Sequence, residues 1–376
     1  MSPDTLPTQR RSWVEVDLSA LRHNVRTLRK HLKKSGTPAF IAIIKANAYG
    51  HGAARIATEL APHVDAFGVA TVQEALEISS CKKDVLLLGP TVEENLQEAF
   101  AAGIIFTISN RSELQHLIAQ HSATPSPPPL RVHLKVDTGM GRVGSHPGDF
   151  SDLLSAAAQE KVLSVFSMGT HLPSADCDPE FTHRQLQNFT EMIAPVRKAF
   201  PGVLVHALNS AGVLNFPEFA FDAVRVGLAF YGIAPTDTPL PLRPALTWKT
   251  RLSLVREVPA NTPVSYGSRF ITKRATRLGL LPLGYADGYF RCSSGKNAVL
   301  LQGRRCSQIG TITMDQMMID LSDLPADQEI KPQDEVVLLG SQGSEQISMH
   351  ELAEHANSIP WEIFTSIGSR VDRVYY

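Results

Sequence analysis

Lys45 is the residue of this chain whose position most directly predicts chemistry. It follows the apolar run AFIAII at residues 39–44, which is typical of a buried strand. Partial burial disfavours the charged form of a lysine and lowers its pKa, and a neutral amine is what condensation with an aldehyde requires. The alternative is a structural lysine at a strand end that extends its amine into solvent.

Polar groups also follow four later apolar runs, one group behind each run. They are Arg142, His171, Asn209 with Ser210, and the segment from Arg225 to Gly227. In a parallel barrel the loops after the strands converge on one rim, and that rim is where such folds place their chemistry. Together with Lys45, these residues predict a site built from five strand ends.

Some of these residues also indicate what the rim binds. Arg142 lies in the glycine-rich segment 135–144, and its forked guanidinium could bind a carboxylate, with a surface ion pair as the alternative. The Ser210 hydroxyl and the backbone N–H groups of Gly227 and Leu228 are the kind of donors that hold a phosphate at the last two loops of a barrel. A helix cap and a simple turn are the alternatives for Ser210 and Gly227.

Eight short apolar runs are predicted to form the strands that position these groups. They lie at 39–44, 66–70, 84–88, 104–108, 131–136, 163–169, 203–208 and 221–226. Because the runs are apolar throughout, they are typical of parallel strands buried on both faces. Helical patterns separate them, for example at 51–61, 92–102, 111–120 and 180–199. This alternation predicts an α/β fold of the (β/α)8 barrel type, whereas the alternative, an open doubly wound sheet, lacks a GxGxxG after its first strand.

The pattern changes after the proline-rich segment TPLPLRP at 238–244. Strand-like pieces then follow at 246–257, 277–284, 298–301, 316–321 and 335–339, with one convincing helix around 349–356. We therefore predict a barrel domain over 1–240 and a β-rich domain over 241–376, with the opening strand 12–17 free to pack with the second domain.

Composition excludes several classes of protein. The 36 basic and 37 acidic residues give a net charge of −1. A protein that binds nucleic acid or an anionic membrane surface usually carries an excess of positive charge, which this chain lacks. The chain begins without the apolar core of a signal peptide and has no apolar run long enough to span a membrane. Its four cysteines are far apart in the sequence, so we expect a cytoplasmic protein with reduced thiols and no metal site.

Eight segments of the chain resemble, in the same order, the signature blocks of bacterial alanine racemases. They are AIIKANAYGHG, HLKVDTGMGRVG, GTHLPSAD, NSAG, VRVGLAFYG, VSYGSRF, LPLGYADGY and TMDQMMIDLS. The resemblance extends over nearly the whole chain, from about residue 12 to residue 375. It implies a barrel followed by a β domain, a head-to-tail homodimer with shared active sites, and pyridoxal phosphate as the cofactor.

The resemblance also implies roles for individual residues in a racemase that interconverts L- and D-alanine and supplies D-alanine for the bacterial cell wall. Lys45 would hold the cofactor as a Schiff base, and Arg142 would contact the cofactor phenolate and the substrate carboxylate. Arg225 would face the pyridine nitrogen, with His171 in the hydrogen-bond network behind it. The remaining cofactor contacts would come from Tyr49, Asn209, Ser210, Gly227 and Leu228.

Racemisation needs an acid/base group on each face of the α-carbon. The resemblance implies Lys45 on one face and Tyr266, contributed across the dimer, on the other. Because a phenol ordinarily keeps its proton near neutral pH, Tyr266 needs nearby positive charge or hydrogen-bond donors, which His171 and Arg225 could supply. The other implied positions are Met314 and Tyr285, at the substrate and its access path, and Lys135, which carbamylation would turn into an anion.

Three alternatives to an alanine racemase remain open. A racemase acting on serine or larger side chains is the first, and a pyridoxal-phosphate decarboxylase of similar architecture is the second. In such a decarboxylase an acidic residue would be expected at the position of Arg225. An arginine there does not give its proton to the pyridine nitrogen, so the ring remains a weaker electron sink. A non-enzymatic cofactor carrier is the third.

The chain also has Ser369 where many family members have a tyrosine, which bears on the phosphate contact and on the width of the entrance.

Overall fold

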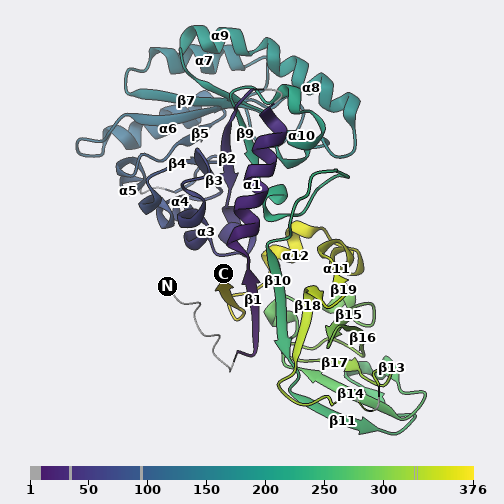
Figure 1. Cartoon of the computed structure of the whole chain (residues 1–376). Coiled ribbons are helices and arrows are strands. Elements are labelled where there is room, and N and C mark those ends of the chain that lie inside the picture. Colours follow the sequence, from purple (N-terminus) through teal and green to yellow (C-terminus); the bar gives the residue numbers. More distant parts are fainter. Residues whose placement is uncertain (1–9, 34–35, 94–95, 326, 328) are drawn as a thin grey trace. The chain divides into compact units, whose positions relative to one another are not determined.

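The computed structural model describes residues 10–33, 36–93, 96–325, 327 and 329–376 (Figure 1). The chain forms two compact units. The barrel unit comprises residues 20–48 and 52–243, and the sheet unit comprises residues 49–51, residues 244–376 and the segment before residue 20. In the described part of the chain, no helix is long and apolar enough to cross a membrane.

Eight parallel strands form the barrel unit, as the sequence predicts. They are β2 (Ala39–Ile43), β3 (Ala66–Val69), β4 (Asp84–Leu87), β5 (Phe106–Ile108), β6 (Leu130–Lys135), β7 (Leu163–Gly169), β8 (Leu204–His206) and β9 (Ala223–Val226). Their order is β4-β3-β2-β9-β8-β7-β6-β5, and a parallel bridge between Leu86 and Ile105 joins the two end strands. The sheet therefore closes on itself, which excludes the open doubly wound alternative.

Helices alternate with these strands along the chain and surround them (Figure 1). They are α1 (Leu18–Leu32), α2 (Lys45–Tyr49), α3 (Ala53–Leu60), α4 (Val72–Glu77), α5 (Gln97–Ala101), α6 (Arg111–Ser122), α7 (Phe150–Gln159), α8 (Pro179–Glu191), α9 (Ile193–Ala199) and α10 (Ser210–Asn215). The helix predicted over 180–199 is two helices that divide at Met192. Pro195 lacks an N–H group, so it fits in the first turn of α9 but not inside one continuous helix.

Two of these helices begin with the same kind of N-terminal cap. In α4, Thr71 Oγ1 accepts the N–H of Glu74 at 3.2 Å, and the Glu74 carboxylate reaches back to the backbone before the helix. In α6, Asn110 Oδ1 accepts the N–H of Glu113 at 2.9 Å, and the Glu113 carboxylate accepts the N–H of Ser109. Each cap satisfies N–H groups that the helix itself leaves unpaired, which typically stabilises a helix by about 1 kcal/mol.

Apolar side chains fill the barrel unit from both faces of the strands. Every residue of β3 and β9 is buried, as expected for parallel strands covered by helices. The largest fully buried side chains of this unit include Phe40, Phe67, Phe106, Phe189 and Phe230. Burial of each such ring stabilises the fold by about 1.5–3 kcal/mol, which makes the barrel a rigid support for its rim.

A ten-stranded sheet forms most of the sheet unit. Its strand order is β11-β14-β17-β16-β15-β18-β10-β1-β20, with β19 paired to β18. The bounds are β1 (Ser12–Val16), β10 (Leu246–Arg251), β11 (Leu254–Val258), β14 (Thr276–Leu281), β15 (Ala298–Leu301), β16 (Arg304–Ile309), β17 (Met317–Asp320), β18 (Glu335–Gln342), β19 (Glu345–Ile347) and β20 (Asp372–Tyr375). A separate hairpin joins β12 (Pro263–Val264) to β13 (Phe270–Ile271). The predicted mostly-β character of this region is confirmed.

The first described strand belongs to this sheet. β1 pairs antiparallel with β10 and parallel with β20. The predicted helix near 349–356 is α11 (Met349–His355), and a second helix, α12 (Pro360–Ser366), follows it. The sequence did not indicate α12, which starts with a proline at its first position and is only two turns long.

Candidate active site

Lys45 begins α2, one residue after the end of β2, so the strand end fixes where its side chain starts. Lys45 is partly buried, and its pKa is lowered, first by that burial and then by the charge of Arg142. The carboxylate of Glu74 acts in the opposite direction. The structure therefore places at this position the partly desolvated amine that the sequence predicts.

The turn that follows Lys45 is left-handed. Residues Ala46 to Tyr49 all have φ between 50° and 53°, a conformation that costs about 1–2 kcal/mol for each non-glycine residue. Hydrogen bonds hold the turn: Asn47 O accepts the N–H of Gly52 at 2.9 Å, and Asn47 Oδ1 accepts the N–H of Ala53 at 2.8 Å. Nothing in the sequence pattern had indicated this turn, because none of these residues is a glycine.

The structure places the other predicted rim residues at the carboxyl ends of four further strands. Arg142 lies after β6, His171 after β7, Asn209 and Ser210 after β8, and Arg225 in β9 with Gly227 and Leu228 behind it. Lys135 is the last residue of β6. The charges of Arg225, Lys135, Arg142 and Lys45 all act on His171, so the barrel rim brings these residues together.

Arg225 is a buried cation held by neutral acceptors. Its Nη1 donates to His206 Nδ1 at 2.5 Å, and its Nη2 donates to the carbonyl oxygens of Thr170 at 2.6 Å and Ala207 at 3.0 Å. Burial lowers the pKa of Arg225 to about 10, so the guanidinium remains charged at neutral pH. Its orientation is fixed by the backbone of two strand exits.

His171 is neutral. Burial, followed by the charge of Arg225, lowers the pKa of His171 to about 2. Arg225 Nη2 lies 3.3 Å from His171 Nδ1, and since a guanidinium can only donate, Nδ1 is the acceptor and the ring proton is on Nε2. His171 can thus supply a hydrogen-bond donor to the site but not the positive charge considered in the sequence analysis.

Two buried histidines that sequence analysis missed support Arg225. The His206 ring stacks on His133 with centroids 4.8 Å apart, and His133 Nδ1 lies 2.8 Å from Ser167 Oγ. Gly169 makes room for His206, because a Cβ there would lie 2.5 Å from the ring. The sequence does show a histidine inside each of two otherwise apolar strand runs. Because polar residues are seldom fully buried without a partner, these two histidines could have indicated a buried polar network.

The segment that carries Arg142 is folded around Asp137. The carboxylate accepts the N–H groups of Gly139 at 2.9 Å, Met140 at 2.7 Å and Arg142 at 2.8 Å. Partial burial opposes ionisation of Asp137, but these bonds together lower its pKa. The Arg142 side chain is exposed, while Lys135 is buried at the base of the segment and its pKa is lowered well below the usual value by burial and then by Arg225.

The loops after β8 and β9 meet at Ser210. The buried Ser210 hydroxyl accepts the N–H of Gly227 at 3.0 Å and of Ala229 at 3.3 Å. Asn209 caps α10 by accepting the N–H of Gly212, and its Nδ2 donates to Leu172 O at 3.0 Å. Ser210 Oγ thus ties the two loops together, and its own O–H proton is left to donate at this corner of the rim, which suits an anionic oxygen such as that of a phosphate.

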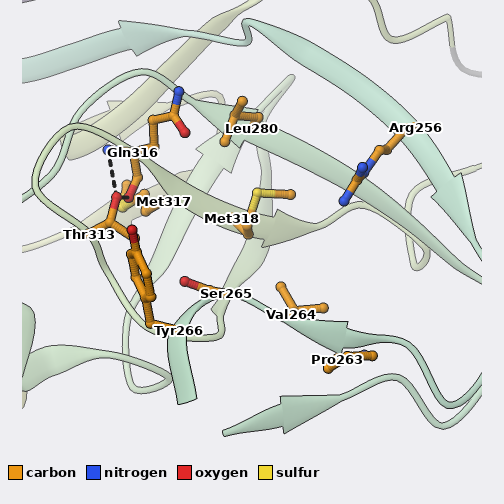
Figure 2. A pocket seen from close by; sticks show the side chains of 10 residues that line it. All are labelled: Arg256, Pro263, Val264, Ser265, Tyr266, Leu280, Thr313, Gln316, Met317 and Met318. Atoms are coloured by element: carbon orange, nitrogen blue, oxygen red, sulfur yellow. Dashed lines mark hydrogen bonds between the residues drawn. The ribbon is translucent and has the colours of Figure 1, made fainter. Parts of the chain in front are cut away.

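The other predicted residues lie in the sheet unit. Tyr266 is 74% exposed, although its backbone is fixed, since its carbonyl oxygen accepts the Thr311 hydroxyl at 2.8 Å. Tyr285 and Met314 are also exposed. Figure 2 shows the Tyr266 ring beside Thr313 at one end of a cavity of about 420 Å³, with Arg256 toward the other end.

Ser369 is exposed and lies in the turn before β20. The next residue, Arg370, forms an ion pair with Asp315 at 2.8 Å and a longer one with Asp287 at 3.6 Å. At position 369 this chain therefore has a small hydroxyl group beside a charged pair. Among the described residues, no cluster of His, Cys, Asp or Glu is arranged to hold a metal ion.

The fold and the rim define a two-unit barrel protein with a desolvated lysine, a buried arginine and a phosphate-type corner. Residues 16–235 match the family described as alanine racemase, N-terminal domain, and residues 245–375 match alanine racemase, C-terminal domain. The chain belongs to the alanine racemase family.

Individual relatives agree over the full length. The chain is 39% identical to the alanine racemase of Symbiobacterium thermophilum, with 98% of each chain covered. It superposes on the crystal structure of alanine racemase from D-cycloserine-producing Streptomyces lavendulae with a TM-score of 0.89 at 36% identity, over 98% of both chains. It also resembles the Bartonella henselae alanine racemase with covalently bound pyridoxal phosphate, at a TM-score of 0.85 and 29% identity, over 98% of this chain and all of the other.

Proposed function

We propose that this chain is a pyridoxal-phosphate-dependent alanine racemase that supplies D-alanine for a bacterial cell wall. The observation that carries the proposal is the partly desolvated amine of Lys45 at the barrel rim, with Arg225 buried at the same rim. A lowered pKa favours the neutral form of a lysine amine, which is the form that condenses with an aldehyde.

The residues of the rim fit the cofactor. Lys45 would bind it covalently, the Ser210 corner with Asn209, Gly227 and Leu228 would hold its phosphate, and Tyr49 and Arg142 would complete its contacts. The cofactor, when bound, supplies a conjugated ring that stabilises negative charge at the α-carbon of an attached amino acid. The meeting of the loops after β8 and β9 at the Ser210 hydroxyl, where barrels of this type hold a phosphate, supports this assignment.

Arg225 favours racemisation over decarboxylation. Its guanidinium keeps its proton at neutral pH and would donate to the pyridine nitrogen without protonating it, so the ring withdraws fewer electrons. A decarboxylase of similar architecture would be expected to have an acidic residue at this position. Neutral acceptors hold the Arg225 guanidinium in place. His171 would add an N–H donor to this network.

Lys45 and Tyr266 would exchange the α-proton on opposite faces of the substrate. The Lys45 amine accepts or returns the proton at its Nζ, and the Tyr266 hydroxyl does so at its Oη. Tyr266 would come from a second copy of the chain, along with Met314 and Tyr285, which would shape the substrate site and its access path. All three side chains are exposed, so they are accessible to a second copy of the chain, which supports this proposal.

Incubation with L-alanine in deuterated water tests the proposal. The cofactor-loaded chain should produce D-alanine that carries deuterium at the α-carbon, and borohydride should fix the cofactor to Lys45. Lys45→Ala should lose both properties. A chain that leaves alanine unchanged but racemises serine would move the substrate assignment, and release of carbon dioxide would identify a decarboxylase.

Three further predictions concern the whole chain. We propose domains over 1–240 and 241–376, which the division into two compact units near residue 243 supports. Action on a small amino acid, without nucleic acid or membrane as partner, and a location in the cytoplasm also remain predictions.

A further inference from the structure

Glu74 links the helix cap of α4 to the turn that follows Lys45. Its Oε2 accepts the N–H of Ala70 at 2.8 Å and of Thr71 at 3.4 Å, which is the ordinary work of a capping residue. Its Oε1 accepts the N–H of Ala46 at 2.6 Å. Ala46 is the residue directly after Lys45 and the first of the left-handed turn, so one carboxylate spans two barrel strand exits.

Glu113 shows what the capping function alone requires. It occupies the same position in α6, its Oε2 accepts the N–H of Ser109 at 2.7 Å, and its Oε1 accepts the side-chain N–H of Asn110 at 2.8 Å. Both of its oxygens are thus used within its own helix start. The bond from Glu74 to Ala46 is therefore an addition to the cap and not a part of it.

We propose that Glu74 is a positioning residue for Lys45. The Glu74 carboxylate holds the left-handed turn and thereby fixes the direction in which the lysine side chain leaves the strand. Four consecutive residues in the left-handed region are strained and need external bonds to persist. Asn47 supplies such bonds at the far side of the turn, and Glu74 supplies one at the side next to Lys45. This inference rests on the proposed function insofar as Lys45 is the reactive amine.

Glu74 also sets part of the charge around the amine. The groups that act on Lys45 are Arg142, which favours the neutral form, and Glu74, which favours the charged form, while His171 at the exit of β7 is neutral. Removal of an anion disfavours an ammonium ion, so loss of the Glu74 charge should lower the pKa of Lys45 further.

The test uses Glu74→Ala and Glu74→Gln in the full-length chain, with Glu113→Ala and Glu113→Gln as matched controls. The first readout is the rate at which acetic anhydride acetylates Lys45 as a function of pH, measured by mass spectrometry without cofactor. Both Glu74 variants should reach half-maximal acetylation at lower pH than the wild type, and both Glu113 variants should match the wild type.

The second readout is kcat for alanine with the loaded enzyme. Glu74→Ala should lower kcat about tenfold or more with little change in KM, because small displacements of a reacting group are costly. Glu74→Gln keeps an oxygen that can accept one N–H, so it should lose less kcat while it shows the full shift in acetylation.

The result that overturns the proposal is a pair of Glu74 variants that behave like the Glu113 variants in both readouts. Acetylation does not depend on the cofactor or on racemisation. A wild-type chain that fails to racemise alanine would therefore contradict the proposed function, while the acetylation profiles would still decide whether Glu74 positions Lys45. Because each Glu113 variant removes an equivalent cap, a shared loss of folding stability is accounted for.

Discussion

At the scale of the single residue, Lys135 is a side chain whose positive charge is strongly disfavoured by its surroundings. It is buried next to Arg225 and within reach of the charge of Arg142, and only Asp137 acts in the opposite direction. A second cation in such surroundings is unfavourable, which favours the neutral amine, the nucleophilic form of a lysine. A neutral amine can add to carbon dioxide with loss of one proton, and the carbamate that forms is an anion.

We therefore expect Lys135 to be carbamylated, because the modification would convert a disfavoured cation into a partner for Arg225 and Arg142. In ¹³C-enriched bicarbonate, the wild-type chain should show a carbamate resonance that Lys135→Met lacks. The resonance should disappear as the pH falls, since protonation releases carbon dioxide from a carbamate. Identical spectra for the two chains would contradict the prediction.

Single residues could be predicted where the sequence shows both the element and its end. Lys45, Arg142 and Arg225 were recognised because each lies at or behind an apolar run, where a barrel exposes its loops. His206 and Glu74 were not, since their importance depends on partners far away in the sequence, Arg225 for the first and Ala46 for the second. A strand run or a helix cap looks the same with or without such a partner.

At the scale of elements, two segments of the sheet unit are joined backbone to backbone. The N–H groups of Tyr285 and Ala286 donate to Thr313 O at 3.0 Å and to Met314 O at 3.1 Å. Gly284 permits this approach, because a Cβ there would lie 2.0 Å from Thr313 O. The segments that carry Tyr285 and Met314 therefore hold each other in place.

Asp287 anchors this pair of segments. Its fully buried carboxylate forms ion pairs with Arg11 and Arg370 and accepts the N–H of Gly284 at 3.0 Å. Asp287→Ala leaves Arg11 and the Gly284 N–H without this acceptor, while Arg370 keeps Asp315, so we expect it to destabilise the sheet unit by about 2 kcal/mol. Calorimetry should show a lower Tm, whereas Asp323→Ala, which breaks the exposed pair with Arg274, should leave the Tm unchanged. Equal effects of the two substitutions would show that Asp287 is not an anchor.

The elements themselves were predictable to different degrees. The barrel strands are short, apolar on both faces and separated by helical patterns, so their periodicity identifies them. β16 was missed because most of its first residues are exposed and polar, as in RRCSQI. The left-handed turn of α2 has no signature, because the bonds that hold it reach residues outside the turn, from Ala46 to Glu74 and from Asn47 to Ala53.

At the scale of the whole molecule, the sheet unit presents apolar groups to solvent. Among the described residues, exposed large side chains of this unit include Leu254, Tyr266, Ile271, Tyr285 and Met314. The cavity beside Tyr266 lies in the same unit. Exposure of apolar side chains to water is unfavourable. In a dimer with two-fold symmetry both chains use the same surface, so one interface would bury these side chains on both copies.

Mixed dimers test whether Lys45 and Tyr266 of one site come from different chains. Lys45→Ala and Tyr266→Phe should each be nearly inactive alone. If the sites are shared, a dimer with one chain of each kind has one intact site, made of Lys45 from the second chain and Tyr266 from the first. Equal amounts that dissociate and reassociate at random should recover about one quarter of the wild-type activity, because half of the dimers are mixed and each has one good site. A mixture of Lys45→Ala with the double variant has no intact site and should stay inactive. Activity that remains at the level of the separate variants, although sedimentation shows mixed dimers, would place both groups of a site on the same chain.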